Sequence, residues 1–182
     1  MNNKLFNLRE SKDLLQKEIA EIIGVHRRTY SSWETKTTIV PLKHLNSLSN
    51  YYNVSMDYLL CLTNKTNYKN SNKLKTLNKN QIGQNLKQLR EEKNLTIRDL
   101  AKVLNTTSST ISAYETGKTM ILTAFAYQLC LKYKISLDWL CGKIDWQLII
   151  VVFFIFQNNP HIIPYHHLPI IHPDQDEIYL YY

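Results

Sequence analysis

Residues 16–34 (QKEIAEIIGVHRRTYSSWE) restrict the possible folds more than any other part of the chain. Their apolar residues recur with the spacing of two short amphipathic helices, at Ile19, Ile22, Ile23, Val25, Tyr30 and Trp33. Gly24 adopts a positive φ without steric cost, so the chain can turn there. Ala20, one turn earlier, is small enough for the second helix to cross closely. We therefore predict two helices that meet at a glycine corner.

The second of these helices, residues 27–34, is expected to point Tyr30 and Trp33 inward. Its outer face then carries polar and basic side chains, namely Arg27, Arg28, Ser31 and Ser32. A helix, a glycine corner and a second helix with a polar outer face describe a helix-turn-helix, whose second helix contacts base edges in DNA. Arginine paired with guanine is the commonest specific contact of this kind. The alternative interpretation is an amphipathic helical hairpin with a solvated face.

A second copy of the pattern lies 81 residues further along the chain. Without any gap, this shift aligns Leu8-Arg9-Glu10 with Leu89-Arg90-Glu91 and Glu34-Thr35 with Glu115-Thr116. It also places Asn105 on Gly24, and asparagine is the next most tolerant residue for a left-handed corner. A chance hairpin would not repeat its corner and its flanking helices in register. We predict two copies of one domain.

The repeat divides the chain into a first domain at 1–63, a linker at 64–81, a second domain at 82–143 and a tail at 144–182. Each domain is predicted to be all-α, with five short helices around one core. The linker is rich in asparagine, lysine and threonine, so we expect it to be flexible and exposed. Its average span as a coil is on the order of 21–25 Å, and it can stretch towards sites about 34 Å apart on DNA.

Charge is spread unevenly along the chain. Residues 1–143 carry a net charge of +11 and residues 144–182 carry −4, which together give the +7 of the whole chain. A basic charge of this size suits contacts with phosphate groups. Cys61, Cys130 and Cys141 lack metal-ligand spacing, so we expect small core or near-core cysteines in a reduced cytoplasm. We recognise no signal peptide and no motif for catalysis, a cofactor or a small-molecule effector.

These residues resemble the phage repressor and Cro family of helix-turn-helix proteins, also called the xenobiotic-response-element-like family. The resemblance covers about 1–63 and 82–143. In the first copy it rests on Leu8-Arg9-Glu10, Leu15-Gln16-Lys17-Glu18-Ile19-Ala20, Gly24-Val25, Trp33-Glu34 and Val54-Ser55-Met56-Asp57-Tyr58-Leu59-Leu60. It implies two tandem lambda-repressor-like five-helix domains joined by a flexible linker, followed by an irregular C-terminal tail. The implied partner is double-stranded DNA, and a homodimer is compatible with this arrangement.

The resemblance also implies which residues contact DNA, with the helices near Arg27 and Ser108 in the major groove and Gln16 near the phosphate backbone. The candidates in the first copy are Gln16, Lys17, His26, Arg27, Arg28, Ser31, Ser32 and Lys36. Those in the second copy are Thr107, Ser108, Ser109, Ser112 and Lys118. Because the second copy lacks the glutamine and both arginines, we expect it to bind DNA more weakly or to serve protein contacts. Ion pairs are implied between Arg9 and Glu34 and between Arg90 and Glu115.

The tail does not belong to the repeat. Its apolar run at 148–156 (LIIVVFFIF) is too short for a membrane span, which needs about 20 residues. The β-branched and aromatic content favours a strand or an aggregation-prone segment. Four histidines lack ligand spacing, so we predict no metal site at His161, His166, His167 and His172. The tail is either a short oligomerisation or interaction segment or a stretch without selected structure.

Two functions compete at this point. The leading hypothesis is a cytoplasmic, sequence-specific DNA-binding transcription regulator, and a repressor in particular, that occupies an operator without catalysis. The alternative is a protein-interaction or antitoxin-type module that keeps the helix-turn-helix fold, which the hydroxyl-rich second copy and the apolar tail favour. Regulation through DNA contact requires binding that weakens steeply as salt rises.

Overall fold

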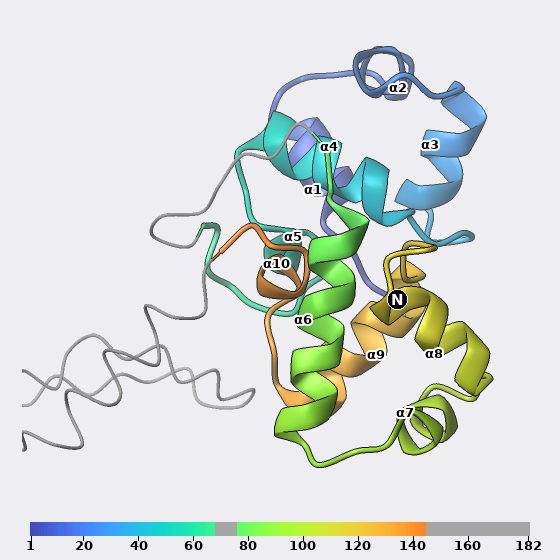
Figure 1. Cartoon of the computed structure of the whole chain (residues 1–182). Coiled ribbons are helices and arrows are strands. Elements are labelled where there is room, and N and C mark those ends of the chain that lie inside the picture. Colours follow the sequence, from blue (N-terminus) through green and yellow to red (C-terminus); the bar gives the residue numbers. More distant parts are fainter. Residues whose placement is uncertain (68–75, 145–182) are drawn as a thin grey trace, which may run out of the picture. The chain divides into compact units, whose positions relative to one another are not determined.

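The structure is a computed structural model that describes residues 1–67 and 76–144. Every regular element within those two ranges is a helix (Figure 1). The first domain comprises α1 (Leu5–Glu10), α2 (Gln16–Ile23), α3 (Arg27–Glu34), α4 (Leu42–Tyr52) and α5 (Met56–Leu59). The second comprises α6 (Lys79–Glu92), α7 (Ile97–Val103), α8 (Ser108–Glu115), α9 (Thr123–Tyr133) and α10 (Leu137–Leu140). The prediction of two all-α, five-helix domains is therefore confirmed.

The two domains share one backbone at the predicted offset. Helices α3, α4 and α5 begin and end 81 residues before α8, α9 and α10. The left-handed backbone positions of the described residues repeat in the same way, in the pairs Asp13 and Asn94, Gly24 and Asn105, Lys36 and Gly117, Asn53 and Lys134, and Cys61 and Gly142. Most residues with a side chain avoid the left-handed backbone conformation, so a residue that adopts it marks a sharp turn. Each turn of the first domain thus recurs in the second.

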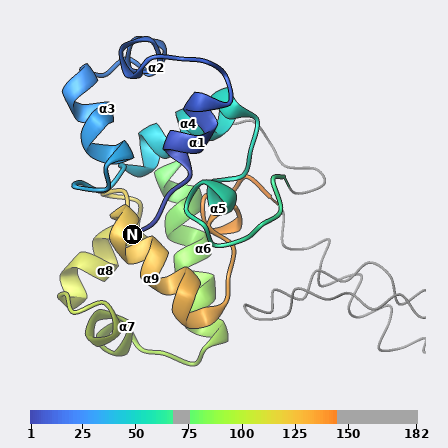
Figure 2. The same ribbon diagram turned by 180° about the vertical axis from the view of Figure 1, so that it is seen from behind.

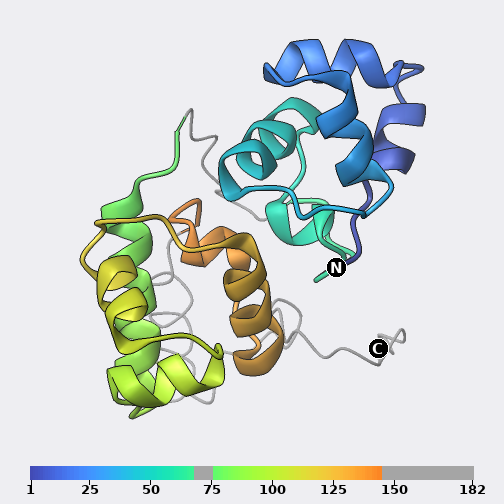
Figure 3. The ribbon, with the colours of Figure 1, turned by 90° about the vertical axis from the view of Figure 1, so that its right-hand side faces the viewer.

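Equivalent apolar side chains form the two cores. Seven positions are fully buried in both domains, and they are Leu5 and Leu86, Ile19 and Leu100, Tyr30 and Ile111, Leu45 and Ala126, Leu48 and Leu129, Met56 and Leu137, and Leu59 and Leu140. Burying a leucine, isoleucine or methionine side chain stabilises the fold by roughly 1.5–3 kcal/mol. The helices of the two domains form separate groups around these cores, as Figure 3 shows in blue to teal and in green to orange.

Helix ends follow the sequence signals closely. Ser55 caps α5 by accepting a hydrogen bond from the backbone N–H of Tyr58 at 3.0 Å. Pro41 precedes α4, where its missing N–H costs no intrahelical bond. Gly24 ends α2 in the left-handed conformation, and the N–H of Val25 then donates to the carbonyl oxygen of Ala20 at 2.9 Å. Ala20 is 1% exposed, as a helix crossing requires.

The largest difference between the domains lies at their first helix. Helix α6 begins at Lys79, inside the range predicted as linker, and is 14 residues long against 6 for α1. Asn78 caps it by accepting from the backbone N–H groups of Asn80 and Gln81. Gly83 lets its first turns lie against α8, since a Cβ there would be 2.4 Å from the carbonyl oxygen of Tyr114. The composition of residues 79–81 predicted a coil, because these residues contain no apolar run.

The start of the predicted linker, residues 64–67, is exposed as predicted, but it is hydrogen-bonded to the first domain. The backbone N–H of Ser55 donates to the carbonyl oxygen of Thr66 at 2.6 Å, and the side-chain amide of Asn67 donates to the carbonyl oxygen of Asn53 at 2.6 Å. Residues 64–67 therefore lie against the first domain. Residues 68–75 fall outside the described residues, and so does the prediction of flexibility for them.

The cysteines divide into two kinds. Cys130 and Cys141 are buried, as predicted, but Cys61 is exposed at the left-handed position that follows α5. The prediction that Cys61 is a core or near-core residue is wrong, because the turn that ends α5 leaves its side chain in solvent. None of the three forms a disulfide.

Membrane and metal sites can be judged only within the described ranges. There, no helix is long and apolar enough to cross a membrane, and no cluster of histidine, cysteine and carboxylate side chains suits a metal ion. The predictions for the tail at 144–182 concern residues that, from 145 onwards, lie outside the described part of the chain.

Candidate nucleic-acid interface

One face of helix α3 packs into the core of the first domain, and the opposite face is open to solvent. Tyr30 is fully buried and Trp33 is 3% exposed, which fixes the rotation of the helix about its axis. Arg27 and Arg28 are exposed in its first turn, and Ser31 and Ser32 are half-buried behind them. The predicted inward face is therefore confirmed, and so is the outward position of both arginines, whereas Ser31 and Ser32 are only partly exposed.

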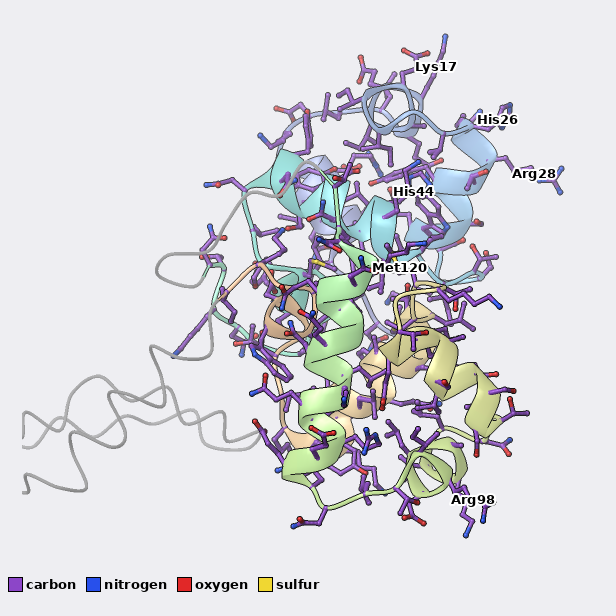
Figure 4. All side chains as sticks on the ribbon, viewed as in Figure 1. Lys17, His26, Arg28, His44, Arg98 and Met120 are labelled. Atoms are coloured by element: carbon purple, nitrogen blue, oxygen red, sulfur yellow. The ribbon has the colours of Figure 1, made fainter. Side chains whose placement is uncertain are left out.

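His26 is the N-cap residue that directly precedes α3. Its Nδ1 accepts a hydrogen bond from the backbone N–H of Arg28 at 3.2 Å, so this nitrogen carries no proton and Nε2–H is left as a donor. Figure 4 shows His26 and Arg28 projecting outward from α3, with Lys17 projecting from α2 nearby. Lys17 is exposed and lies 3.8 Å from the Glu21 carboxylate. These three side chains form a basic, donor-rich outer edge.

Ser32 and Lys36 have local roles that the sequence did not suggest. The hydroxyl of Ser32 donates to the carbonyl oxygen of Thr29 at 2.7 Å and meets the hydroxyl of Thr38 at 2.6 Å. Ser32 therefore ties the loop after α3 back to the helix. Lys36 occupies a left-handed position in that loop with φ of 64°, and its side chain is exposed.

Gln16 belongs to a polar cluster beneath the outer surface. Its Nε2 donates to Oε1 of Glu34 at 3.3 Å, and the same carboxylate accepts two bonds from Arg9, at 2.9 and 2.8 Å. A third Arg9 bond reaches the carbonyl oxygen of Leu14 at 2.7 Å. Gln16 is half-buried at the first position of α2, with one amide hydrogen and its carbonyl oxygen left over for another partner.

The Arg9–Glu34 ion pair, implied by the resemblance, is present and buried, with both residues 7% exposed. Burial acts to raise the pKa of Glu34, but the hydrogen bonds from Arg9 and Gln16 outweigh it and lower that pKa. The hydrogen bonds with Glu34 raise the pKa of Arg9 above its usual range, against the opposing effect of burial. The pair joins α1 to the end of α3 and so sets the position of the recognition helix.

The corresponding Arg90–Glu115 ion pair is also present, with N–O distances of 2.7 and 3.0 Å. It is more open to solvent, since both residues are half-buried. No glutamine joins it, because Ile97 occupies the position equivalent to Gln16. Glu115 therefore holds α8 through fewer bonds than Glu34 uses for α3.

Helix α8 exposes hydroxyl groups in place of guanidinium groups. Ser108, Ser109 and Ser112 are exposed, and no lysine or arginine occurs between residues 108 and 115. Thr107 caps the helix by accepting from the backbone N–H of Thr110, and its hydroxyl also meets that of Ser109 at 2.8 Å. The hydroxyl of Thr107 is thus engaged within the helix start, while Lys118 is exposed in the loop beyond it.

Arg98 is a basic residue of this surface that the sequence analysis did not select. It is exposed on α7 and projects outward in Figure 4. Its position is 81 residues after Lys17, so the repeat itself was the signal that could have found it. The second domain therefore keeps a cation beside its recognition helix, although α8 has none.

Comparison with known proteins identifies the class. Residues 5–59 match a family described as "Helix-turn-helix", and residues 83–145 match a family described as "Helix-turn-helix domain". Both domains are helix-turn-helix domains, in agreement with their backbones. The chain thus contains two helix-turn-helix domains, and the first is of the phage repressor/Cro type that its sequence resembles.

Two similar proteins carry names that mention regulation. One is an "Uncharacterized HTH-type transcriptional regulator YobD" of Bacillus subtilis (strain 168), 37% identical over 60 residues. Those residues make up 33% of this chain and 54% of the relative, so the match spans about half of that protein. A crystal structure of a transcriptional regulator from Listeria innocua is 23% identical and covers 43% of this chain and 76% of its own, with a TM-score of 0.33. A TM-score this low does not define a common arrangement.

Proposed function

We propose that the protein is a sequence-specific DNA-binding transcription regulator, and that it represses by occupying an operator in the cytoplasm without catalysis. The observation that carries this proposal is the exposure of Arg27 and Arg28 in the first turn of α3 while Tyr30 and Trp33 anchor the opposite face. Residues near the start of a recognition helix are the ones that meet base edges. Guanidinium groups placed there suit guanine or phosphate oxygens.

The surroundings of α3 support the same role. Lys17 and the His26 ring lie on the outer edge with Arg28, and the loop residue Lys36 is exposed beyond the helix. Cations next to a recognition helix suit the phosphates that flank a groove. The buried Arg9–Glu34 pair limits the movement of α3, which favours base reading over diffuse attraction.

The proposal is tested by fluorescence anisotropy with a pool of random 30-base-pair duplexes at several salt concentrations. We expect affinity to fall steeply with salt, with a slope near −0.9 for each phosphate neutralised. Arg28→Ala should weaken binding, whereas Lys132→Ala, which removes a cation at the end of α9, is the matched control and should not. Binding without salt dependence would reject DNA regulation.

A second candidate function rests on α8. Its exposed Ser108, Ser109 and Ser112, with no cation on the helix, suit contacts with another protein as well as with phosphate oxygens. An antitoxin-type or adaptor module that keeps the helix-turn-helix fold would use such a face. In the same anisotropy experiment this function predicts no salt-dependent binding of any duplex.

A further inference from the structure

The first-turn aspartates of α5 and α10 each accept hydrogen bonds from the start of the other domain's helix. The backbone N–H of Leu137 donates to Oδ1 of Asp57 at 2.7 Å, and the hydroxyl of Ser136 donates to Oδ2 of the same carboxylate. In return, the backbone N–H of Asp57 donates to Oδ2 of Asp138 at 2.9 Å. Asp57 is 2% exposed and Asp138 is fully buried. Each aspartate therefore serves the helix start of the other domain, where backbone N–H groups need acceptors.

The exchange has the form of a two-fold contact. Asp57 and Asp138 are equivalent residues, 81 positions apart, and each meets the other's helix. When residue i contacts residue j and j contacts i, the interface is isologous, as in a symmetric dimer. An arrangement in which one domain simply trails the other would join non-equivalent surfaces. From these reciprocal bonds we infer that an approximate two-fold axis at the contact of α5 with α10 relates the two domains.

A second bridge strengthens the pairing on one side of that axis. Lys143 follows α10, is 3% exposed, and donates from Nζ to the hydroxyl of Ser49 and to Oδ1 of Asn50, the latter at 3.2 Å. Both acceptors belong to α4 of the first domain. The position equivalent to Lys143 in the first domain is Leu62, so this bridge has no mirror image. The backbones of α5 and α10 are paired symmetrically, but the charged Lys143 bridge is present on one side only.

The recognition helices follow the same symmetry. Helices α3 and α8 have the same length and offset, so the axis that relates α5 to α10 also relates α3 to α8. They lie along the same edge of the two domains in both Figure 1 and Figure 2. Duplex DNA has local two-fold axes, and two-fold related recognition helices therefore suit two half-sites about one helical turn apart.

We propose that one chain, paired with itself through α5 and α10, binds a two-part DNA site with unlike halves and does so as a monomer. The proposal rests on the proposed function and names its target. The half read by α3 should hold guanine or phosphate contacts for Arg27 and Arg28, whereas the half at α8 meets Ser108 and Ser109. A homodimer would instead place two equal recognition helices on equal halves.

The target is tested by enriching the random 30-base-pair duplexes that the full chain binds and sequencing them. We expect two unlike half-sites at one fixed spacing of about 10 base pairs, with one chain per duplex in analytical ultracentrifugation. A single enriched half-site, or two half-sites without a fixed spacing, overturns this inference and leaves DNA regulation standing. Two chains on each duplex also overturn it. Failure to enrich any sequence, together with salt-independent binding, is the separate failure of the proposed function.

The pairing itself is tested by inserting 5 base pairs between the enriched half-sites. The insertion turns one half-site to the opposite face of the duplex and should lower the affinity of the native chain on the order of 100-fold. Asp57→Ala removes the carboxylate that serves α10, and the same insertion should then cost less than about tenfold.

A matched control separates pairing from the mere loss of a helix cap. Asn78→Ala removes an N-cap acceptor within the second domain alone and should keep the native sensitivity to the insertion. Equal sensitivity of the Asp57→Ala variant and the native chain would overturn the inference. If Asp57→Ala loses helicity by circular dichroism, Asp57→Asn, which removes the charge and one of the two acceptor oxygens, and Lys143→Gln are compared with the native chain in its place.

Discussion

The two domains agree in their turns and differ on the faces that point outward from their helix-turn-helix pairs. Gly24 and Asn105 occupy the same left-handed corner, whereas Arg28 of α3 is replaced by Ser109 of α8. A left-handed turn tolerates few residues, so the fold restricts that position strongly. An exposed position on a recognition helix is restricted only by what it touches. The two copies therefore offer different chemical groups on the outward faces of their recognition helices.

The ion pairs offer the largest test of this comparison. Glu34→Ala should leave the buried Arg9 with only the exposed Glu10 carboxylate as an ion-pair partner, and should cost up to about 3–5 kcal/mol of unfolding free energy. Glu115→Ala, whose partner Arg90 is more exposed, should cost less. Urea midpoints of both variants measure the difference, with Glu34→Gln as the isosteric control. Equal midpoints for the two alanine variants would mean that burial does not distinguish the domains.

The exchanged aspartates predict that stability declines as the pH rises. Burial and the nearby Asp57 carboxylate raise the pKa of Asp138 to about 7, from an ordinary value of 3.8, while Lys143 opposes this shift and Cys130 and Cys141 lie buried nearby. The folded state then keeps a proton that the unfolded chain releases. The unfolding free energy should therefore fall between about pH 4 and pH 7, by on the order of 1–3 kcal/mol.

Urea midpoints across this range check that prediction. Asp138→Asn carries no titratable proton at this position and should flatten the profile between about pH 4 and pH 7. Asp99→Asn, which changes an exposed capping carboxylate on α7, serves as the control and should leave the decline in place. A native midpoint that rises with pH over this range would contradict the prediction.

Exchanging residues between recognition helices sharpens the comparison at the DNA surface. Arg28→Ser should cost about 1–3 kcal/mol of binding free energy if the guanidinium reads a base. The reciprocal Ser109→Arg should strengthen binding and steepen the salt slope by about 0.9 if the new side chain reaches a phosphate. Anisotropy titrations at two salt concentrations measure both. No response to Ser109→Arg would indicate that α8 lies away from the duplex.

The smallest expected effect concerns the two corners. Gly24→Ala should cost about 1–2 kcal/mol from its left-handed backbone alone, because an added Cβ there meets no atom within 4 Å. Asn105→Gly should change the stability by only a few tenths of a kcal/mol, since the glycine relieves a mild strain and adds unfolded-state freedom. Thermal unfolding of both variants tests this. A similar loss in both would show that the corners are not equivalent.

Much of the fold follows from local patterns. The helix at residues 27–34 and the corner at Gly24 were predicted because apolar spacing and a turn-forming glycine lie in neighbouring residues. The early start of α6 was missed because lysine and asparagine at 78–80 resemble a linker, and only the close approach of Gly83 to α8 reveals the helix. Gln16 was assigned to phosphate, whereas its amide also serves Glu34.

The exchange between Asp57 and Asp138 could not be predicted from the sequence, because it also depends on contacts between distant residues. An acidic residue in the first turn of a helix has an adequate local explanation, since its own helix start attracts negative charge. Nothing in the spacing tells which helix start it will serve. Contacts between domains depend on the surfaces that form when both domains have folded. Those surfaces are determined by residues throughout both domains and not by a local spacing.

Helices α5 and α10 belong to one polypeptide. The equilibrium between their paired and separated states therefore does not depend on the protein concentration. Two separate subunits come apart on dilution, whereas tethered domains meet at an effective concentration set by the connecting segment, which is typically millimolar for short flexible linkers. Helices α5 and α10 should therefore stay together however dilute the protein is. Occupancy of a DNA site would then rise in simple proportion to the amount of protein, without the threshold that assembly from monomers imposes.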